Sequence, residues 1–308
     1  MQPASRGDMM GETKKNPAAV RSPAGQKGDI MAEEMNKENT QQDVMTEEGE
    51  NRRRIAVVTG ASSGLGRQFV RMLDRAGEAD EIWVVARRRY RLEELQDVVD
   101  TPLKMLAYDL TDRQAVRDIQ GMLSDEDPDV RWLINCAGMG KIGSIETISM
   151  EDNETMIDLN CRAAVTMTQA CVPYMEEGAR IMNICSAAGF QPLPYLNVYA
   201  ATKAFMIRFS RALGRELKVH RISVTAVCPY WVSDTEFIQM AKKTGNSEYI
   251  HSFPLASQEK YVAHRAFRDT QRRKAVSTPS VFATVERVLA KLFPSGAAMS
   301  IWDVVRKL

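Results

Sequence analysis

From residue 54 onward, short apolar runs alternate with stretches whose apolar residues recur every three or four positions. The short runs, rich in Val, Ile and Leu, predict buried β-strands, and the longer stretches predict helices with one apolar face. The predicted strands are 55–59, 81–86, 103–108, 130–135, 180–186 and 222–228. The predicted helices are 66–76, 89–99, 113–123, 150–174 and 199–218. This alternation predicts an α/β fold: one doubly wound, mostly parallel sheet with helices on both faces.

The beginning of the chain differs in composition from the rest. Residues 1–53 contain few aliphatic residues and no aromatic one, so they cannot bury enough surface to offset chain entropy. We therefore expect residues 1–53 to form a disordered tail and residues 54–308 to form a single domain. A regulatory or docking role for the tail stays open. Within the domain, residues 236–280 are interpreted as a substrate lid and 281–308 as a C-terminal helical segment.

Composition narrows the class of protein. The formal net charge of +1 gives no indication of nucleic-acid binding, so no nucleic-acid partner is predicted. The five cysteines form no C-x-x-C pair, which favours reduced, buried thiols in a cytoplasmic protein and no metal site. No apolar run approaches the roughly 20 residues of a membrane-spanning helix.

Three closely spaced glycines, Gly60, Gly64 and Gly66, follow the first predicted strand and open the first predicted helix. Glycine there permits a tight turn, lets backbone N–H groups approach a phosphate, and lets the helix pack closely on the strand. Far downstream, Tyr199 and Lys203 stand four residues apart, on one face of a predicted helix. A nearby ammonium favours the phenolate, whereas burial alone raises the pKa of tyrosine. A cofactor cradle and an activated tyrosine together predict hydride transfer at a carbonyl.

With these motifs in order, the chain resembles the short-chain dehydrogenase/reductase family over about residues 55–235, which implies a Rossmann-type fold. The family's glycine motif matches residues 59–66, and its N-N-A-G motif matches residues 135–138 with Cys136 in second place. The resemblance assigns four catalytic residues: Asn160, Ser186, Tyr199 and Lys203. The residues expected to contact the cofactor, of which Arg87 and Arg88 follow from the chemistry of the second strand's end, are Gly60, Ser62, Ser63, Gly64, Leu65, Gly66, Arg87, Arg88, Asp109, Leu110, Asn135, Ala137, Gly138, Tyr199, Lys203, Pro229 and Val232.

Chemistry and resemblance together suggest a role for each catalytic residue. Tyr199 is expected to give a proton to the carbonyl oxygen, or to accept it from an alcohol in the reverse direction. Ser186 is expected to hydrogen-bond the same oxygen. The resemblance implies that Lys203 also holds the nicotinamide ribose, and that Asn160 anchors a water that relays protons to Lys203.

The end of the second strand bears on the choice of cofactor. NAD-binding sites usually place an acidic residue there to hold the ribose 2′-hydroxyl. This chain has Arg87 and Arg88 instead, and guanidinium groups can pair with a 2′-phosphate. The sequence therefore favours NADP(H) over NAD(H).

The chain departs from the family after the sixth strand. Tyr230 replaces a usual glycine, Thr235 lies one residue later than the usual threonine, and no seventh strand is evident. The apolar positions of residues 281–292 mark one helix face, which we interpret as packing over the cleft or at a subunit contact. Contact with a membrane surface is the alternative, because basic residues precede this helix.

The sequence thus predicts an NADP(H)-dependent oxidoreductase that interconverts a ketone or aldehyde and an alcohol. The apolar loops at 187–198 and 230–261 favour an apolar small-molecule substrate. By resemblance, the helices at 150–174 and 199–218 are expected to form a homodimer or homotetramer. The alternative function is a non-catalytic dinucleotide-binding redox sensor.

Overall fold

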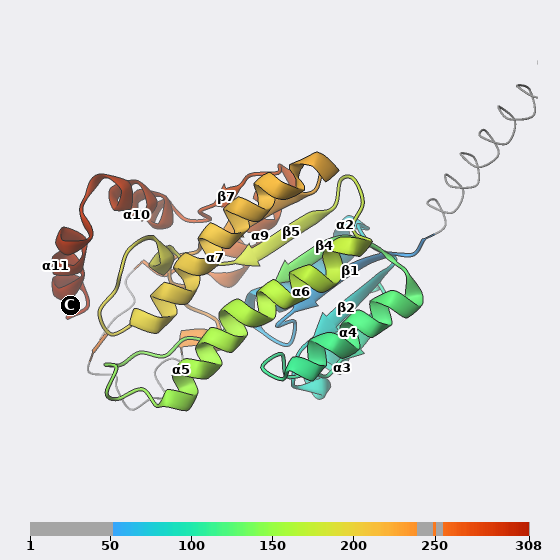
Figure 1. Ribbon diagram of the computed structural model, residues 1–308, viewed down its shortest axis with the longest axis horizontal. Helices are drawn as coiled ribbons and strands as arrows, with labels where there is room; N and C mark the ends of the chain where they lie inside the picture. Colours follow the sequence, from blue (N-terminus) through green and yellow to red (C-terminus); the bar gives the residue numbers. More distant parts are fainter. Residues whose placement is uncertain (1–51, 239–248, 251–254, 308) are drawn as a thin grey trace, which may run out of the picture. The chain divides into compact units, whose positions relative to one another are not determined.

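The computed structural model describes residues 52–238, 249–250 and 255–307 (Figure 1). Its strands pair in parallel to form one sheet in the order β3-β2-β1-β4-β5-β6-β7. The strands are β1 (Arg54–Thr59), β2 (Glu81–Val85), β3 (Leu103–Leu106), β4 (Asp129–Asn135), β5 (Arg180–Ile184), β6 (Ser223–Val227) and β7 (Val276–Ser277). The strand order reverses between β1 and β4, where doubly wound sheets hold their ligands. The predicted α/β fold, a Rossmann-type sheet in a single domain, is confirmed.

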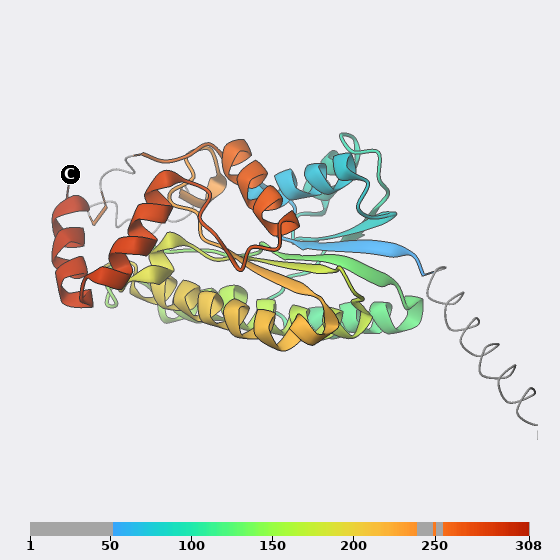
Figure 2. The same ribbon diagram turned by 90° about the horizontal axis from the view of Figure 1, so that it is seen from above.

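Helices cover both faces of the sheet (Figure 2). They are α2 (Gly64–Ala76), α3 (Arg89–Gln96), α4 (Arg113–Glu126), α5 (Met150–Ile157), α6 (Ala163–Cys171), α7 (Asn197–Glu216), α9 (Glu259–Gln271), α10 (Val281–Leu292) and α11 (Ser295–Val305). Successive side chains of a strand point to opposite faces, so β1 supplies two cores. Ile55 and Val57 join the core under α4 and α6. Ala56 and Val58 join the core under α2, α3 and α9.

Part of the region interpreted as a lid, residues 236–280, belongs to the core of the domain, so a lid role does not fit α9 and β7. Helix α9 packs Ala263, Ala266 and Phe267 into the core beside α2, and the Phe267 ring stacks on Trp132 with centroids 4.9 Å apart. A seventh strand is also present, although none was expected: β7 continues the sheet beyond β6. Of this region, residues 239–248 and 251–254 lie outside the described residues.

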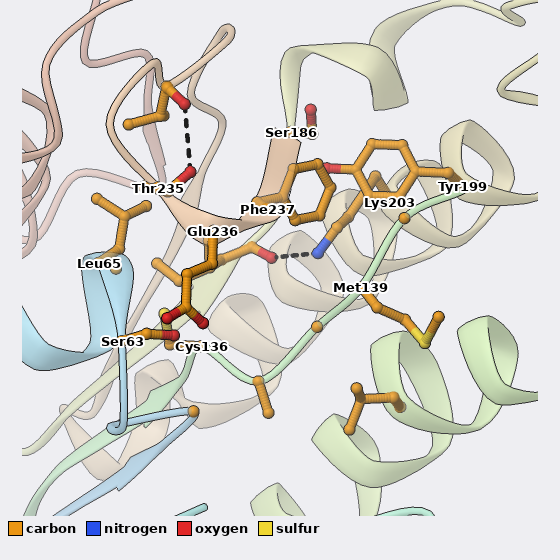
Figure 3. A pocket seen from close by; sticks show the side chains of 18 of the residues that line it. Ser63, Leu65, Cys136, Met139, Ser186, Tyr199, Lys203, Thr235, Glu236 and Phe237 are labelled. Carbon is orange, nitrogen blue, oxygen red and sulfur yellow. Dashed lines mark hydrogen bonds between the residues drawn. The ribbon is translucent and has the colours of Figure 1, made fainter. Parts of the chain in front are cut away.

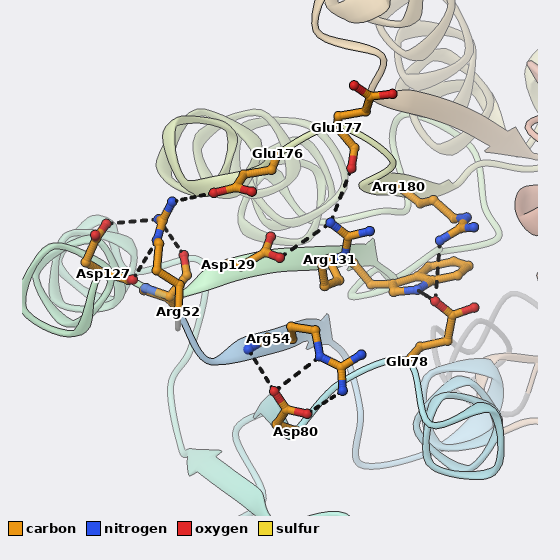
Figure 4. Close-up of polar contacts among 12 residues, drawn as sticks. Arg52, Arg54, Glu78, Asp80, Asp127, Asp129, Arg131, Glu176, Glu177 and Arg180 are labelled. Atoms are coloured by element: carbon orange, nitrogen blue, oxygen red, sulfur yellow. Dashed lines mark hydrogen bonds and ion pairs between the residues drawn. The ribbon is translucent and has the colours of Figure 1, made fainter. Parts of the chain in front are cut away.

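The folded domain begins two residues earlier than the predicted boundary. Arg52 donates hydrogen bonds to Asp127 and Glu176 at 2.9 Å each, and its guanidinium also reaches the Pro128 carbonyl at 2.8 Å (Figure 4). Arg53 pairs with Glu126 on the same side of the molecule. These contacts attach both arginines to the domain. The rest of the predicted tail, residues 1–51, lies outside the described residues.

One long helix was predicted for residues 150–174, and the structure interrupts it with a π-helical segment, Asp158–Arg162, between α5 and α6. Such segments widen a helix by one residue per turn and occur often at functional sites. This one carries Asn160, one of the four residues assigned to catalysis. In the described part of the chain, no helix is both long enough and apolar enough to cross a membrane.

Candidate active site

A cavity of about 680 Å³ opens at the carboxyl ends of β1, β2, β4, β5 and β6 (Figure 3). Residues from nearly every predicted motif line it together. They are Gly60, Ser62, Ser63, Gly64, Leu65, Arg87, Arg88, Asp109, Leu110, Ala137, Gly138, Ser186, Tyr199, Lys203, Pro229 and Val232. The predicted residues Gly66, Asn135 and Asn160 lie outside this lining, and each has a supporting position described below.

The glycine loop fits tightly between β4 and α2. Gly60 has φ +70°, and a Cβ there would lie 2.8 Å from the Ala137 backbone nitrogen. A Cβ on Gly66 would lie 2.3 Å from the Gly60 carbonyl oxygen. Both positions therefore require glycine, because no side chain fits between the loop and its neighbours. Gly66 supports the loop from the helix side and does not face the cavity.

Helix α2 begins at the cavity with Ser63 as its N-cap. The Ser63 side chain makes no capping hydrogen bond to the helix, and the first turn contains no acidic residue. The positive end of the helix dipole is therefore not neutralised from within α2 itself. Such a helix start is suited to an anionic group such as a phosphate.

The loop after β4 is fixed by polar contacts from behind the cavity. The Thr59 hydroxyl accepts hydrogen bonds from the backbone nitrogens of Cys136 (3.0 Å) and Ala137 (3.1 Å). Asn135 was predicted to contact the cofactor, but its buried amide donates to Asn183 (2.8 Å) and Thr168 (3.1 Å). The Asn135 side chain therefore points into the protein, ties β4 to β5 and α6, and does not line the cavity.

Asn160 holds the next part of this loop. Its amide oxygen accepts from the Met139 nitrogen (2.9 Å), and its amide nitrogen donates to the Met139 carbonyl (2.8 Å) and the Thr202 hydroxyl (3.0 Å). A Cβ on Gly138 would lie 3.0 Å from the Asn160 oxygen and 3.5 Å from the Lys203 nitrogen. Asn160 thus connects the π-helical segment, the β4 loop and α7 directly beside the lysine.

Tyr199 and Lys203 occupy one face of α7, as their spacing predicted, and both are buried. The Lys203 ammonium lies 5.7 Å from the centroid of the Tyr199 ring and donates to the Ile184 carbonyl at 2.8 Å (Figure 3). Burial raises the pKa of Tyr199 to about 12, and a hydrogen bond with Ser186 acts in the opposite direction. Burial also lowers the pKa of Lys203. Desolvation therefore dominates the titration of both groups.

Both arginines at the end of β2 line the cavity, and each already faces a carboxylate. Arg87 lies 3.6 Å from Asp109. Arg88 donates to Glu236 at 2.8 Å and to the Ser62 hydroxyl at 3.3 Å. Glu236 comes from the segment after β6, at the start of a helical turn, and the sequence analysis did not assign it to the site.

The opposite end of the cavity is apolar. Its walls include Leu193, Tyr230, Trp231, Phe237 and Trp302. The Phe237 and Tyr199 ring centroids lie 5.4 Å apart. The Trp302 indole donates to the Pro194 carbonyl at 3.0 Å, which fixes α11 to the loop before α7. The C-terminal helices therefore contribute to the wall of the substrate end.

Glu286 of α10 is a second cavity residue that sequence reasoning missed. The sequence analysis interpreted the apolar stripe of α10 as packing over the cleft or at a subunit contact, and the structure turns that stripe outward, away from the cleft. Its members are Val281, Val285, Val288, Leu289 and Leu292, which are 44–71% exposed. The inward face instead carries Glu286, and burial raises the pKa of its carboxyl to about 7.

Replacing Glu286 with glutamine should change how stability depends on pH. The pKa of Glu286 in the folded protein, about 7, lies above its ordinary value of 4.5. At pH values between these two, the unfolded chain therefore binds fewer protons than the folded protein. Wild-type stability is then lost as pH rises through this window, and the Glu286→Gln variant lacks that loss. Between pH 5 and pH 8, the free energy of unfolding of this variant, taken relative to wild type, should rise by up to about 3 kcal/mol.

Urea unfolding at pH 5 and pH 8 measures this difference. Glu154→Gln on the exposed side of α5 is the control, and its difference from wild type should be the same at both pH values. Equal pH profiles for wild type and Glu286→Gln would contradict the expectation.

The described residues bring together no group of three or more His, Cys, Asp or Glu side chains that could hold a metal ion.

Comparison with known proteins identifies this arrangement. Residues 54–246 match the family model for short chain dehydrogenase. The chain is 37% identical over 186 residues to the NADP-dependent 3-hydroxy acid dehydrogenase YdfG of Escherichia coli, covering 59% of this chain and 74% of that relative. It is 32% identical over 178 residues to an uncharacterized oxidoreductase of Staphylococcus epidermidis, covering 57% of this chain and 76% of that relative.

Solved structures agree with the sequence matches. The short-chain dehydrogenase from Sphingobium yanoikuyae in complex with NADPH has a TM-score of 0.67 and 27% identity, covering 80% of this chain and 94% of that chain. A serine dehydrogenase complexed with NADP+ has a TM-score of 0.63 and 30% identity, covering 73% of this chain and 93% of that chain. The family match over residues 54–246, with the fold and the cavity motifs, shows that this chain belongs to the short-chain dehydrogenase family and is an oxidoreductase.

Proposed function

We propose that the protein is an NADP(H)-dependent oxidoreductase that interconverts a ketone or aldehyde and the corresponding alcohol. The observation that carries this proposal is the placement of Ser186, Tyr199 and Lys203 in one cavity with the glycine loop. A tyrosine able to exchange a proton then lies beside a cradle suited to a dinucleotide.

The residues present fit such a cofactor. Gly60 and Gly66 leave no room for side chains at the loop, and α2 directs its positive end toward the cavity. Lys203 and the Asp109-Leu110 pair line the same cavity, where the family resemblance places the nicotinamide ribose and the adenine. When bound, the reduced cofactor supplies the hydride.

The protein's own residues would supply the proton and position the substrate. We propose that the Ser186 hydroxyl donates a hydrogen bond to the substrate's carbonyl oxygen, and that Tyr199 gives its proton to that oxygen. With a pKa near 12, Tyr199 is fully protonated at neutral pH and is ready to act as the acid in reduction. The Lys203 ammonium and the positive ring of the oxidised cofactor would lower this pKa in the reverse direction.

The π-helical segment that carries Asn160 is proposed to complete the proton path. Its side chain is occupied by Met139 and Thr202, so any water held here would have to bind backbone groups of the π-helical segment. Widening a helix shifts its hydrogen-bond pattern from i→i+4 to i→i+5, which can release a carbonyl for water. We propose that this segment, rather than the Asn160 amide itself, holds the relay water beside Lys203.

Preference for NADP(H) over NAD(H) is part of the proposal. It is supported by Arg87 and Arg88 at the end of β2 and by the absence of a carboxylate from that strand end. The similarity to an NADP-dependent dehydrogenase of Escherichia coli and to structures solved with NADPH or NADP+ supports the same preference. The apolar wall formed by Leu193, Trp231 and Phe237 supports an apolar substrate.

The assembly is also a proposal. Exposed apolar side chains on the helices expected to pair, such as Ile157 (51% exposed) and Phe205 (48%), support a homodimer or homotetramer. Met156, on the first of these helices, is fully buried within the subunit and is not part of that exposed surface.

Turnover of a panel of apolar ketones, measured by oxidation of NADPH and of NADH at 340 nm, tests the proposed activity. We expect turnover with at least one ketone and a higher kcat/KM with NADPH. Tight binding of both cofactors without turnover of any ketone would favour the redox-sensor alternative. Equal kcat/KM values with the two cofactors would contradict the NADP(H) preference.

A further inference from the structure

Glu236 occupies the position where an anion would meet the basic residues of the cofactor site. One carboxylate oxygen lies 2.8 Å from an Arg88 guanidinium nitrogen, and the other lies 4.0 Å from Arg91. Ser63, the N-cap of α2, lies beside the same carboxylate (Figure 3) and contributes to lowering its pKa. The hydrogen bond from Arg88 is the largest contribution that lowers the pKa of Glu236, so the group is ionised near neutrality.

These partners are those expected for a phosphate. A 2′-phosphate would take charge-assisted hydrogen bonds from Arg88 and from hydroxyls beside it, Ser62 and Ser63. The Ser62 hydroxyl already accepts a hydrogen bond from Arg88 at 3.3 Å. Helix α2 supplies no carboxylate of its own at its positive end. The Glu236 carboxylate therefore satisfies a site that would otherwise attract an anion.

The residues immediately before and after Glu236 also cover the cavity. The methyl group of Thr235 faces Gly64, where an added Cβ would lie 3.5 Å from it. Phe237 packs on the Tyr199 ring. The contacts of Thr235 and Phe237 thus hold the Glu236 carboxylate at the glycine loop.

We propose that Glu236 is a cofactor-specificity residue that competes with the 2′-phosphate of NADP(H) for Arg88 and Ser63. This inference rests on the proposed function, because it assumes that a dinucleotide occupies the cavity. A 2′-phosphate must displace the carboxylate, whereas the 2′-hydroxyl of NAD(H) need not. Glu236 then reduces an NADP(H) preference that the arginines alone would make larger.

A pair of adenosine nucleotides tests the inference without hydride chemistry. Adenosine 2′,5′-bisphosphate and AMP differ by the 2′-phosphate alone, and calorimetry gives a Kd for each. In Glu236→Gln, the preference for the bisphosphate over AMP should increase by about 10-fold, because the competing charge is gone. In Glu236→Asp, which retains the charge, the preference should stay closer to that of wild type.

Glu94→Gln is the matched control. Glu94 lies 3.5 Å from Arg91 and 3.9 Å from Arg67, but it does not line the cavity. The Glu94→Gln variant also loses one negative charge beside these arginines. Its preference for the bisphosphate over AMP should stay within about twofold of the wild-type value, since water screens the effect of this charge. An increase in Glu94→Gln equal to that in Glu236→Gln would overturn the inference.

Two further results would overturn it. An unchanged preference in Glu236→Gln would show that the carboxylate does not compete. A weaker bisphosphate affinity would show that Glu236 closes over the bound cofactor instead of opposing it. In both cases the proposed function stands, because nucleotides still bind. Failure of every protein to bind either nucleotide would overturn the proposed function together with this inference.

Discussion

Replacing Tyr199 with phenylalanine is expected to lower kcat for carbonyl reduction by about 10²–10⁴-fold, the usual contribution of general acid catalysis. The phenyl ring keeps its contact with Phe237 and its place on α7, so the cavity should keep its shape. NADPH affinity should therefore remain near the wild-type value. Steady-state kinetics and a fluorescence titration of NADPH measure the two quantities separately.

Thr202→Ser on the same helix is a useful control for this variant. Its hydroxyl can still accept from Asn160 and donate to the Tyr199 carbonyl, so kcat should fall little. A Tyr199→Phe variant that kept more than a tenth of wild-type kcat would show that another group delivers the proton.

Replacing Gly66 with alanine should have the second large effect. The added methyl group would lie 2.3 Å from the Gly60 carbonyl oxygen, a distance that forces α2 away from the loop. Overpacking of this kind usually costs about 1–3 kcal/mol of folding stability. Because the cofactor loop itself must move, NADPH affinity should fall by at least about 10-fold, which corresponds to 1.4 kcal/mol.

Gly121 of α4 provides the comparison. An added Cβ there meets nothing within 4 Å, so Gly121→Ala should stabilise the protein by about 0.5–1 kcal/mol through the higher helix propensity of alanine. Urea unfolding and NADPH titration of both variants test the pair. Wild-type NADPH affinity in Gly66→Ala would show that the loop tolerates the methyl group and that the close contact is not essential.

The sequence was most informative where a long pattern or a fixed motif existed. Long apolar runs predicted the first six strands. The motifs led to most of the cavity lining because parallel strands bring their carboxyl ends together. Strand β7 was missed because two residues cannot display an alternating pattern.

Features that depend on tertiary contacts could not be predicted from the sequence. The π-helical turn at Asp158–Arg162 has the same apolar spacing as an ordinary helix. The acidic residues of the cavity, Glu236 and Glu286, follow no motif, and their neighbours are distant in sequence. For α10, the sequence could not decide between packing over the cleft and a subunit contact; the helix packs on the cleft through Ala283 and Phe282, beside Tyr230, and leaves its apolar stripe exposed.

The position of β4 beside β1 has a consequence for synthesis of the chain on the ribosome. Contacts between these strands join residues 75 positions apart, as in the approach of Thr59 to Ile134. At roughly 5–20 residues per second, β1 emerges several seconds before the strand that covers one of its edges. During that interval β1 can pair with β2 alone, and its other edge of unpaired backbone groups remains open to other chains. We expect the nascent protein to depend on chaperones most strongly before residue 135 emerges.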